Sequence, residues 1–396
     1  MVHLWRMFWS VVPVLVFGTA ANEHSAATWE ATNQFGTTSH SWRAITGSDD
    51  LSKLAAVVQS GSIWFSLDSG TSWMESSGTA SNHWTCITSS STFDHLVAGV
   101  HGGGLYLGTY SAAHGSLSWA QVDLQTVGIH DWEAVASSSA GTTIMAFPSY
   151  ANMWHSADTG ATWSEITGPG ALSWSAAAMS SDGMTVVAAV MGGNMWAATD
   201  GGWTWNAIGP SSNSWHAVVC SLDCSAIRAA VYGGNLWSGY GVEHGHSWSW
   251  TEHSSTTGNW KSIASSADGL KLVASSYGGN IWTAVSVTDV HGVIWTEDTS
   301  LASMSNWWGI ASSSDGSKLS AAVFGGNIWM YGGVTTANEA SSNDPQQPSS
   351  PPSPPPPSLP PPSPPPPGGG DEGGEALLPS PPPPSLPPPS PPPPGG

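Results

Sequence analysis

A unit that begins with tryptophan recurs seven times along this chain, and the repetition constrains the fold more than any other feature. The leading tryptophans are Trp42, Trp84, Trp132, Trp174, Trp215, Trp260 and Trp308. Their spacings of about 41 to 48 residues match the length of one four-stranded blade of a β-propeller. The sequence therefore predicts an all-β fold made of repeated blades.

Each unit reads as four short strands separated by turn signals. The first strand starts at the leading tryptophan and ends in a Ser-x-Asp-Gly turn, as at residues 266–269. A run of small residues follows and ends in Gly-Gly-Asn, after which a third strand opens with an apolar residue and tryptophan, as at Ile281 and Trp282. Asp-Gly favours hairpins because glycine tolerates a positive φ. The small residues suit inner strands that are covered on both faces.

A second motif, Ser-x-Asp-x-Gly-x-[Thr/Ser]-Trp, joins the third and fourth strands. It is complete at residues 66–73 and 156–163 and partial at 198–205. Its defining positions are Asp68, Gly70, Trp73, Asp158, Gly160, Trp163, Asp200, Gly202 and Trp205. We expect the carboxylate to accept backbone N–H groups of its own turn. We also expect glycine to supply the left-handed position, so these residues have a structural role.

This motif resembles the Asp-box, or BNR repeat, of sialidase-like propellers, sortilin ectodomains and xyloglucanases. The resemblance covers about residues 26–331 and implies the propeller fold. In those families the Asp-box lies on the periphery, away from the active site, so the resemblance implies no particular activity.

The last unit lacks a fourth strand, and the start of the chain supplies a match for it. Residues 26–32 repeat the fourth-strand pattern of residues 161–167. We therefore expect a seven-bladed propeller closed by an N-terminal strand, since closure removes the exposed sheet edges. A count of six or eight blades would leave one strand without a place.

Composition divides the chain into three segments. Residues 1–21 have the charged start, apolar run and small residues of a secretory signal peptide. The apolar run at 7–17 is too short to span a bilayer, although a retained signal anchor is the alternative. Residues 22–335 hold the propeller, and residues 336–396 form a Pro/Ser-rich tail. We expect a protein secreted to an extracellular matrix or cell wall.

The tail holds 27 of the 31 prolines, and the segment at residues 353–369 recurs letter for letter at 380–396. Such a chain has little to bury and favours disorder or an extended polyproline II rod. Ser followed by four prolines resembles the extensins and other hydroxyproline-rich wall glycoproteins, which implies hydroxylated and glycosylated prolines. An unmodified spacer is the alternative.

Charge excludes several partners. The formal net charge is −20 with only seven Lys and Arg, so the surface cannot neutralise a row of phosphates, and nucleic-acid binding is excluded. After signal cleavage we also expect no membrane binding. No Cys/His spacing resembles a zinc site, so we expect no metal and no cofactor. We expect a monomer.

The three cysteines suit an oxidising compartment. Cys220 and Cys224 stand four residues apart, where other units carry the Asp-Gly turn, and we expect them to form a disulfide. Cys86, in the first strand of the second unit, is expected to be a buried small apolar residue.

Counting residues limits the possible activities. Sialidases bind the substrate carboxylate with three arginines, and the mature chain has two, Arg43 and Arg228. The same count cannot supply the arginine patch of photosystem assembly-factor propellers. A glycoside hydrolase needs two carboxylates about 5 to 9.5 Å apart, and no pair stands out in the sequence. A hydrolase therefore remains an alternative, as does a purely structural matrix protein.

Binding without catalysis is the function that the sequence favours, with a polysaccharide or a wall or matrix glycoprotein as partner. Tryptophan faces stack on sugars and asparagine amides bind hydroxyls, and both types recur on one predicted face. The candidate ligand-binding residues are Trp307, which we expect to be exposed, and Asn194, Asn235, Asn280 and Asn327. The alternative is that the asparagines only favour tight turns and the tryptophans only pack between blades.

Overall fold

The structure is a computed structural model that describes residues 28–332 except 33–34, 36–38, 80, 243–246, 287–292 and 302–304. Within these residues the regular elements are β-strands apart from one short helix, α1 (Leu124–Val127). The chain divides between Ala337 and Asn338. The predicted signal peptide (1–21) and tail (336–396) lie outside the described residues.

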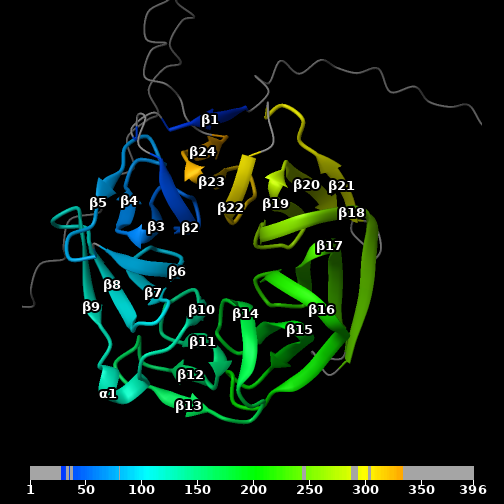
Figure 1. Ribbon diagram of the computed structural model, residues 1–396, viewed down its shortest axis with the longest axis horizontal. Coiled ribbons are helices and arrows are strands. Elements are labelled where there is room, and N and C mark those ends of the chain that lie inside the picture. The colour runs from blue at the N-terminus through cyan, green and yellow to red at the C-terminus, as the bar shows by residue number, and fades with distance from the viewer. Residues whose placement is uncertain are drawn as a thin grey trace, which may run out of the picture. The chain divides into compact units, whose positions relative to one another are not determined.

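The strands form antiparallel sheets set radially around a central axis, which is the arrangement of a β-propeller (Figure 1). Most of the innermost strands begin at or just before a leading tryptophan. They are β2 (His40–Gly47), β6 (Asn82–Ser89), β10 (Trp132–Ser137), β14 (Leu172–Met179), β22 (Ser305–Ser312) and the second halves of β16 (Asn206–Cys220) and β18 (Ser247–Ser265). The strands that follow them are β3 (Leu54–Gly61), β7 (His95–Val100), β11 (Ile144–Ala151), β15 (Val186–Ala198), β17 (Ala226–Val242), β19 (Lys271–Gly279) and β23 (Leu319–Gly326).

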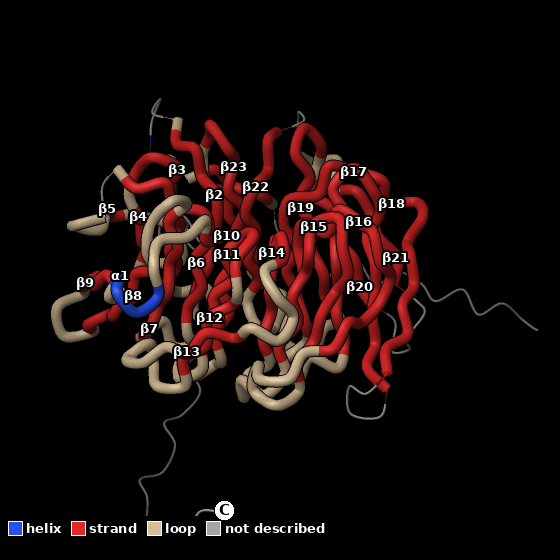
Figure 2. The backbone as a smooth tube through the Cα atoms, turned by 60° about the horizontal axis from the view of Figure 1, so that its bottom comes forward, coloured by secondary structure: helices blue, strands red, loops and turns tan. Residues whose placement is uncertain are grey.

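The outer strands are shorter and complete each sheet (Figure 2). The third positions hold β4 (Ile63–Ser66), β8 (Leu105–Ser111), β12 (Met153–Ser156), β20 (Ile281–Ser286), β24 (Ile328–Tyr331) and the ends of β15 and β17. The outermost strands are β5 (Met74–Glu75), β9 (Ser116–Gln121), β13 (Ser164–Ile166), β21 (Val293–Glu297) and the first halves of β16 and β18. Four strands, β15 to β18, are long because each continues through a turn or crossover that interrupts the chain in other units.

The leading tryptophans pack between neighbouring sheets and tie them together. Trp42, Trp84, Trp132 and Trp260 each donate an indole N–H at 3.0 to 3.1 Å to the carbonyl of a glycine that closes the Gly-rich turn of the preceding unit. Each of these side chains is at most 1% exposed. In these four units the leading tryptophan joins successive sheets by a hydrogen bond, whereas the indole N–H groups of Trp174, Trp215 and Trp307 have no partner among the described residues.

The seventh leading tryptophan is Trp307, and the expectation that Trp308 leads this unit was wrong. Trp307 pairs with Val323 as Trp42 pairs with Val58 and Trp84 with Val100. Trp307 is 1% exposed, so the expectation that it is the exposed member of the pair was also wrong. Successive residues of a strand point to opposite faces, so Trp307 takes the buried leading position and Trp308 points to the other face.

The turns between first and second strands form a closed ring of backbone hydrogen bonds. Each turn donates one N–H to a carbonyl of the next turn, from Asp49 to Ser91 and onward around the axis, until Ser314 donates to Asp49. The participating residues are Asp49, Ser91, Ser139, Ser181, Leu222, Ala267 and Ser314, with distances of 2.6 to 2.9 Å. This end of the axis is thereby held by the backbone itself.

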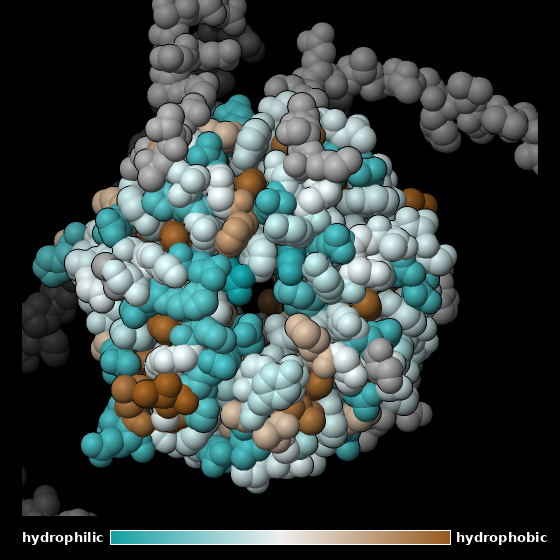
Figure 3. All heavy atoms as spheres, viewed as in Figure 1, coloured by the Kyte–Doolittle hydropathy of each residue, from teal (hydrophilic) through white to brown (hydrophobic). Residues whose placement is uncertain are grey.

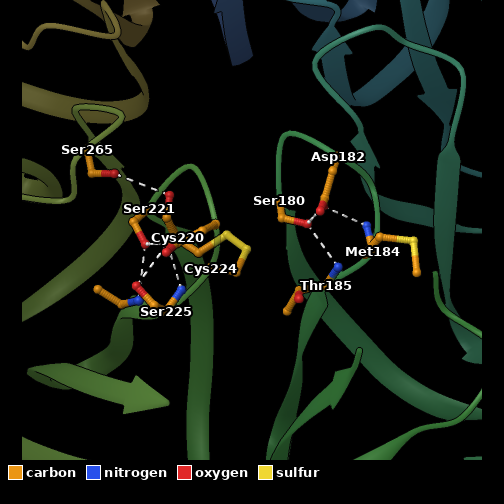
Figure 4. Close-up of a disulfide and its surroundings, with 11 residues drawn as sticks. Ser180, Asp182, Met184, Thr185, Cys220, Ser221, Cys224, Ser225 and Ser265 are labelled. Carbon is orange, nitrogen blue, oxygen red and sulfur yellow. Dashed lines mark hydrogen bonds between the residues drawn. A yellow bond between two sulfur atoms is a disulfide. The ribbon is translucent and has the colours of Figure 1, made fainter. Parts of the chain in front are cut away.

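The disulfide lies in one of these turns. Cys220 and Cys224 are joined with an S–S distance of 1.98 Å, and Ser221 bonds Asp223 just as Ser180 bonds Asp182 in the preceding unit (Figure 4). Cys224 has a φ of 52° where the preceding unit has Gly183 at 76°. The disulfide therefore occupies a turn of unchanged geometry.

The motif at residues 66–73 forms the hydrogen bonds expected of it. Asp68 accepts from the backbone N–H of Ser72 at 2.8 Å and from the hydroxyl of Ser66 at 2.8 Å. The copy at 156–163 repeats both contacts through Asp158, and in the partial copy Asp200 accepts from the N–H of Thr204 at 2.9 Å. The tryptophans of the motif, Trp73, Trp163 and Trp205, are buried and donate back to Gly70, Gly160 and Gly202.

The two ends of the described chain meet in one sheet. Strand β1 (Trp29–Ala31) pairs antiparallel with β24, with Glu30 opposite Met330. The Trp29 indole N–H donates to Asp298 at 2.9 Å, and the ring is 8% exposed. A segment from the start of the propeller thus occupies the outer position of its last sheet.

The described residues lack two features that would indicate other functions. They contain no helix that is long and apolar enough to cross a membrane. They also contain no cluster of three or more His, Cys, Asp and Glu that could hold a metal ion.

Candidate functional site: the mouth of the axial channel

A β-bulge interrupts every innermost strand directly after its leading tryptophan. The register between Trp42 and Val58 slips before Ala44, and the same shift recurs in each unit. A bulge leaves one residue unpaired and re-aims its side chain. The bulged residues, which we call the bulge ring, are Arg43, Thr85, Glu133, Ser175, His216, Lys261 and Trp308.

The bulge ring lines an axial cavity of about 420 Å³, a volume within the range of small-ligand sites. Figure 3 shows the surface hollowed at the centre of the ring, with mostly polar atoms around it. The tryptophan before each bulge is buried, whereas every bulge-ring residue is half-buried. The units are alike on both sides of the bulge and differ at it, so the chemistry of the cavity is set by these seven positions.

Cationic and aromatic side chains cover one part of the mouth. The Arg43 guanidinium carbon and the Lys261 Nζ each lie 4.4 Å from the centroid of the Trp308 ring. Lys261 also lies 4.4 Å from the Tyr232 ring centroid and 3.2 Å from the His216 Nε2. Cation–π contacts of this kind hold charges that water no longer fully surrounds.

Histidine and carboxylate groups lie beside Glu133, which is the member of this group that lines the cavity. The His101 Nδ1 lies 3.4 Å from an oxygen of Asp131 and 3.9 Å from one of Glu133. The Asp131 carboxylate also accepts the backbone N–H of Gly102 at 3.0 Å. His83 stacks edge-on against His101 with ring centroids 5.1 Å apart. No carboxylate pair stands out in the sequence, and the structure brings Asp131 and Glu133 to one histidine.

Burial perturbs the titration of the charged members. Burial and the charge of Arg43 lower the pKa of Lys261 to about 8, and burial with the charge of Lys261 lowers the pKa of His216 to about 4. Burial raises the pKa of Glu133, against the opposing effects of Arg43 and His101. His216 is therefore neutral and Lys261 mostly charged at neutral pH, while the acidity of Glu133 is weakened.

The predicted ligand-binding residues lie elsewhere. The Asn235 and Asn280 amides donate at 2.8 Å to Glu252 and Glu297 on the outermost strands. None of Asn194, Asn235, Asn280, Asn327 and Trp307 lines the cavity. The recurring asparagines hold the turn to the outer strand, which is the structural alternative for Asn235 and Asn280.

The other predicted residues keep structural roles. Cys86 is buried with its pKa raised to about 12 by burial, as expected for an inert thiol. Arg228, the second arginine of the described chain, is 2% exposed and donates to the Tyr240 hydroxyl at 2.8 Å. Sequence reasoning missed the bulge ring, although one signal was present, since the residue after each leading tryptophan is the most variable position of an otherwise regular strand.

Solved structures support the fold. The chain is similar to YCF48 bound to a D1 peptide (11% identity, TM-score 0.59, covering 78% of this chain and 96% of that one). It is similar to YCF48 from Cyanidioschyzon merolae (14%, 0.59, 78% and 99%) and to the β-propeller domain of Myceliophthora thermophila Cps50, or Swd1 (11%, 0.58, 77% and 99%). The prediction of a β-propeller is confirmed.

At these identities the likeness concerns the fold alone. No protein-family model matches the chain, and no curated protein does.

Proposed function

We propose that the chain is a secreted, non-catalytic binding propeller that takes a carbohydrate or a wall glycoprotein at the mouth of its axial channel. The observation that carries this proposal is the bulge ring, where seven equivalent positions hold seven different side chains around one cavity. Bulges that re-aim side chains are common next to functional sites. A framework that is regular everywhere except at the residues facing a cavity is suited to binding.

The proposal includes a seven-bladed Asp-box propeller closed by its N-terminal strand. Seven leading tryptophans, the closed ring of backbone hydrogen bonds and the pairing of β1 with β24 support this count and this closure. The turn contacts of Asp68 and Asp158 support the Asp-box assignment.

Secretion to a matrix or wall is also part of the proposal. The signal-like residues 1–21 and the Pro-rich residues 336–396 support it from the sequence. The Cys220–Cys224 disulfide is consistent with an oxidising compartment. The tail would act as a stalk that tethers the propeller.

An array of polysaccharides and glycoproteins tests the proposal, with the mature full-length chain as the probe. We expect saturable binding that Trp308→Leu weakens at least about tenfold, because Trp308 holds both mouth cations. Trp203→Leu is the matched control, since Trp203 is 54% exposed and belongs to the loop at 198–205, at the opposite end of the strands. Equal loss in both variants, or no binding at all, would contradict the proposal.

Two observations favour other partners. One of the similar structures is described as bound to a peptide, so glycoproteins and peptides belong on the same array. Asp131 and Glu133 converge near His101, and the raised pKa of Glu133 is typical of a general acid. A glycoside hydrolase is therefore the second candidate. Release of reducing sugar ends that Glu133→Gln abolishes would favour it over pure binding.

A further inference from the structure

Two cations at the channel mouth form no close ion pair among the described residues, although the Glu133 charge acts on Arg43 from farther away. Within the described residues no carboxylate oxygen lies within 4 Å of Arg43 or Lys261, since the ion pairs found there belong to His101. The Arg43 Nε is shielded from solvent and has no hydrogen-bond partner, and the same holds for the His216 Nδ1. The Trp308 ring satisfies the charge of both cations in part but accepts none of their directed hydrogen bonds.

An unpartnered buried donor is costly, and the cost is removed when a ligand supplies the acceptor. The fork of a guanidinium matches the two oxygens of a carboxylate, and an ammonium adds a second charge-assisted bond. Arg43 is therefore arranged for an oxyanion beside Trp308, and Lys261 adds a second positive charge that acts on the same region.

The rest of the mouth favours hydroxyl groups. The Glu133 carboxylate lines the cavity and can accept hydrogen bonds from sugar hydroxyls, with Asp131 close by at His101. Acidic groups here repel further anions. The chain as a whole carries a formal charge of −20, so a ligand with many negative charges is repelled at long range even if one of its groups fits.

We propose that the mouth binds the carboxylate of a single uronic acid side group on an otherwise neutral polysaccharide. The inference rests on the proposed binding function and names its ligand class. The oxyanion meets Arg43 beside the charge of Lys261, the sugar hydroxyls meet Glu133 in the cavity wall, and the neutral backbone avoids the repulsion. The cavity of about 420 Å³ suits one side group better than a length of chain.

The experiment measures binding of the mature full-length chain to three polymers at low and moderate salt. They are a xylan with sparse glucuronic acid substituents, the same xylan after its carboxyl groups have been reduced to hydroxymethyl groups, and polygalacturonate. We expect the substituted xylan to bind most tightly and its reduced form to lose about ten- to a hundredfold in affinity, the effect of one charge-assisted pair. Polygalacturonate should bind weakly and improve as salt screens the repulsion.

Two variants assign the effect to the mouth. Arg43→Gln should weaken binding of the substituted xylan by about tenfold or more and leave the reduced xylan unchanged. Lys261→Gln provides the second variant if Arg43→Gln does not fold, as judged by its thermal melt. Lys271→Gln is the charge-matched control, because Lys271 is exposed and donates to the Asp315 carbonyl at 2.8 Å in the turns at the other end of the axis.

Each other outcome overturns the inference in a distinguishable way. Equal binding of the native and reduced xylans would reject the carboxylate site while leaving the carbohydrate-binding function intact. Tighter binding of polygalacturonate than of the substituted xylan at low salt would reject the preference for a single isolated carboxylate. If none of these polymers binds and the array described above shows binding of a peptide through its free terminal carboxylate, the uronic acid is rejected and the mouth is reassigned to a protein partner. No binding to any probe would reject the function and the inference together.

Discussion

At the scale of single residues, two adjacent positions of each unit have different roles. The leading tryptophan is buried in each unit and in several units bonds the preceding turn. The next residue is bulged toward the cavity. A substitution of the leading tryptophan therefore tests packing, and a substitution of the bulged residue after it tests binding.

Trp84→Phe should destabilise the protein more than Trp174→Phe. Both side chains are at most 1% exposed. The Trp84 indole N–H donates to the carbonyls of Gly61 and Thr79, whereas the Trp174 indole N–H has no partner among the described residues. Both variants lose packing, and Trp84→Phe also leaves buried carbonyls unpaired, so we expect a difference of about 1–2 kcal/mol. Chemical unfolding measures this difference in the free energy of unfolding. Equal losses would show that the hydrogen bonds of the Trp84 indole do not stabilise the fold.

Lys261→Met should stabilise the fold at pH 7. The folded pKa of Lys261, about 8, lies below its ordinary 10.5 because of burial and the charge of Arg43. At pH 7 Lys261 is charged in both the folded and the unfolded protein, and burying this charge near Arg43 lowers the stability of the folded state. Between pH 8 and 10.5 only the unfolded state retains the proton, so this cost disappears as pH rises.

The ammonium is about half exposed, so solvent screening limits the gain from Lys261→Met to about 1 kcal/mol. Thermal melts at pH 7 and pH 10.5 would follow it, with a gain present at the first and absent at the second. The exposed Lys271→Met serves as the control and should show no gain. A lower melting temperature for Lys261→Met at pH 7 would mean that the contacts with Trp308 and Tyr232 outweigh the confined charge.

At the scale of elements, the turn motif connects neighbouring sheets as well as its own strands. Gly160 has a φ of 85°, and a Cβ there would lie 2.7 Å from the Leu107 side chain of the preceding sheet. Gly202 has a φ of 95° and would meet Met145 at 2.3 Å. The glycine is therefore required both by the backbone and by the adjoining sheet.

Gly160→Ala should destabilise the protein by about 2–3 kcal/mol, from the left-handed backbone and the contact with Leu107. Gly168→Ala is the matched control, since that residue has no positive φ and nothing lies within 4 Å of its added Cβ. Urea unfolding of the two variants separates them. Similar midpoints would show that the motif is not tightly packed against the preceding sheet.

At the scale of the whole molecule, stability depends on contacts between sheets that are far apart in the sequence. The backbone ring from Asp49 to Ser314 joins one end of the axis, and β1 joins the last sheet through β24. Every other sheet is continuous in sequence with its neighbour, so these contacts bring together segments about 300 residues apart.

Trp29→Ala should therefore lower stability out of proportion to the three-residue strand that it belongs to. The ring is 8% exposed, bonds Asp298 and lies 5.4 Å from the Tyr331 ring centroid. We expect a loss of about 3–5 kcal/mol, whereas Glu30→Ala, which removes an exposed neighbour, should cost little. Thermal unfolding and limited proteolysis provide the measurement. A change below about 1 kcal/mol for Trp29→Ala would mean that β1 is dispensable.

The sequence by itself determined the repeat, the order of strands and turns, and the mechanism of the Asp68 and Asp158 turns, because each depends on residues close along the chain. It also indicated the Cys220–Cys224 pair from spacing. Only the tertiary structure decided which residues face the cavity. A bulge changes the alternation of a strand by one residue. Which of Trp307 and Trp308 is buried and which lines the cavity therefore cannot be read from the sequence. The contacts of Arg43 and Lys261 with Trp308, and of Asp131 and Glu133 with His101, depend on how separate units are arranged around one axis. No local sequence pattern encodes the distances between residues of different units.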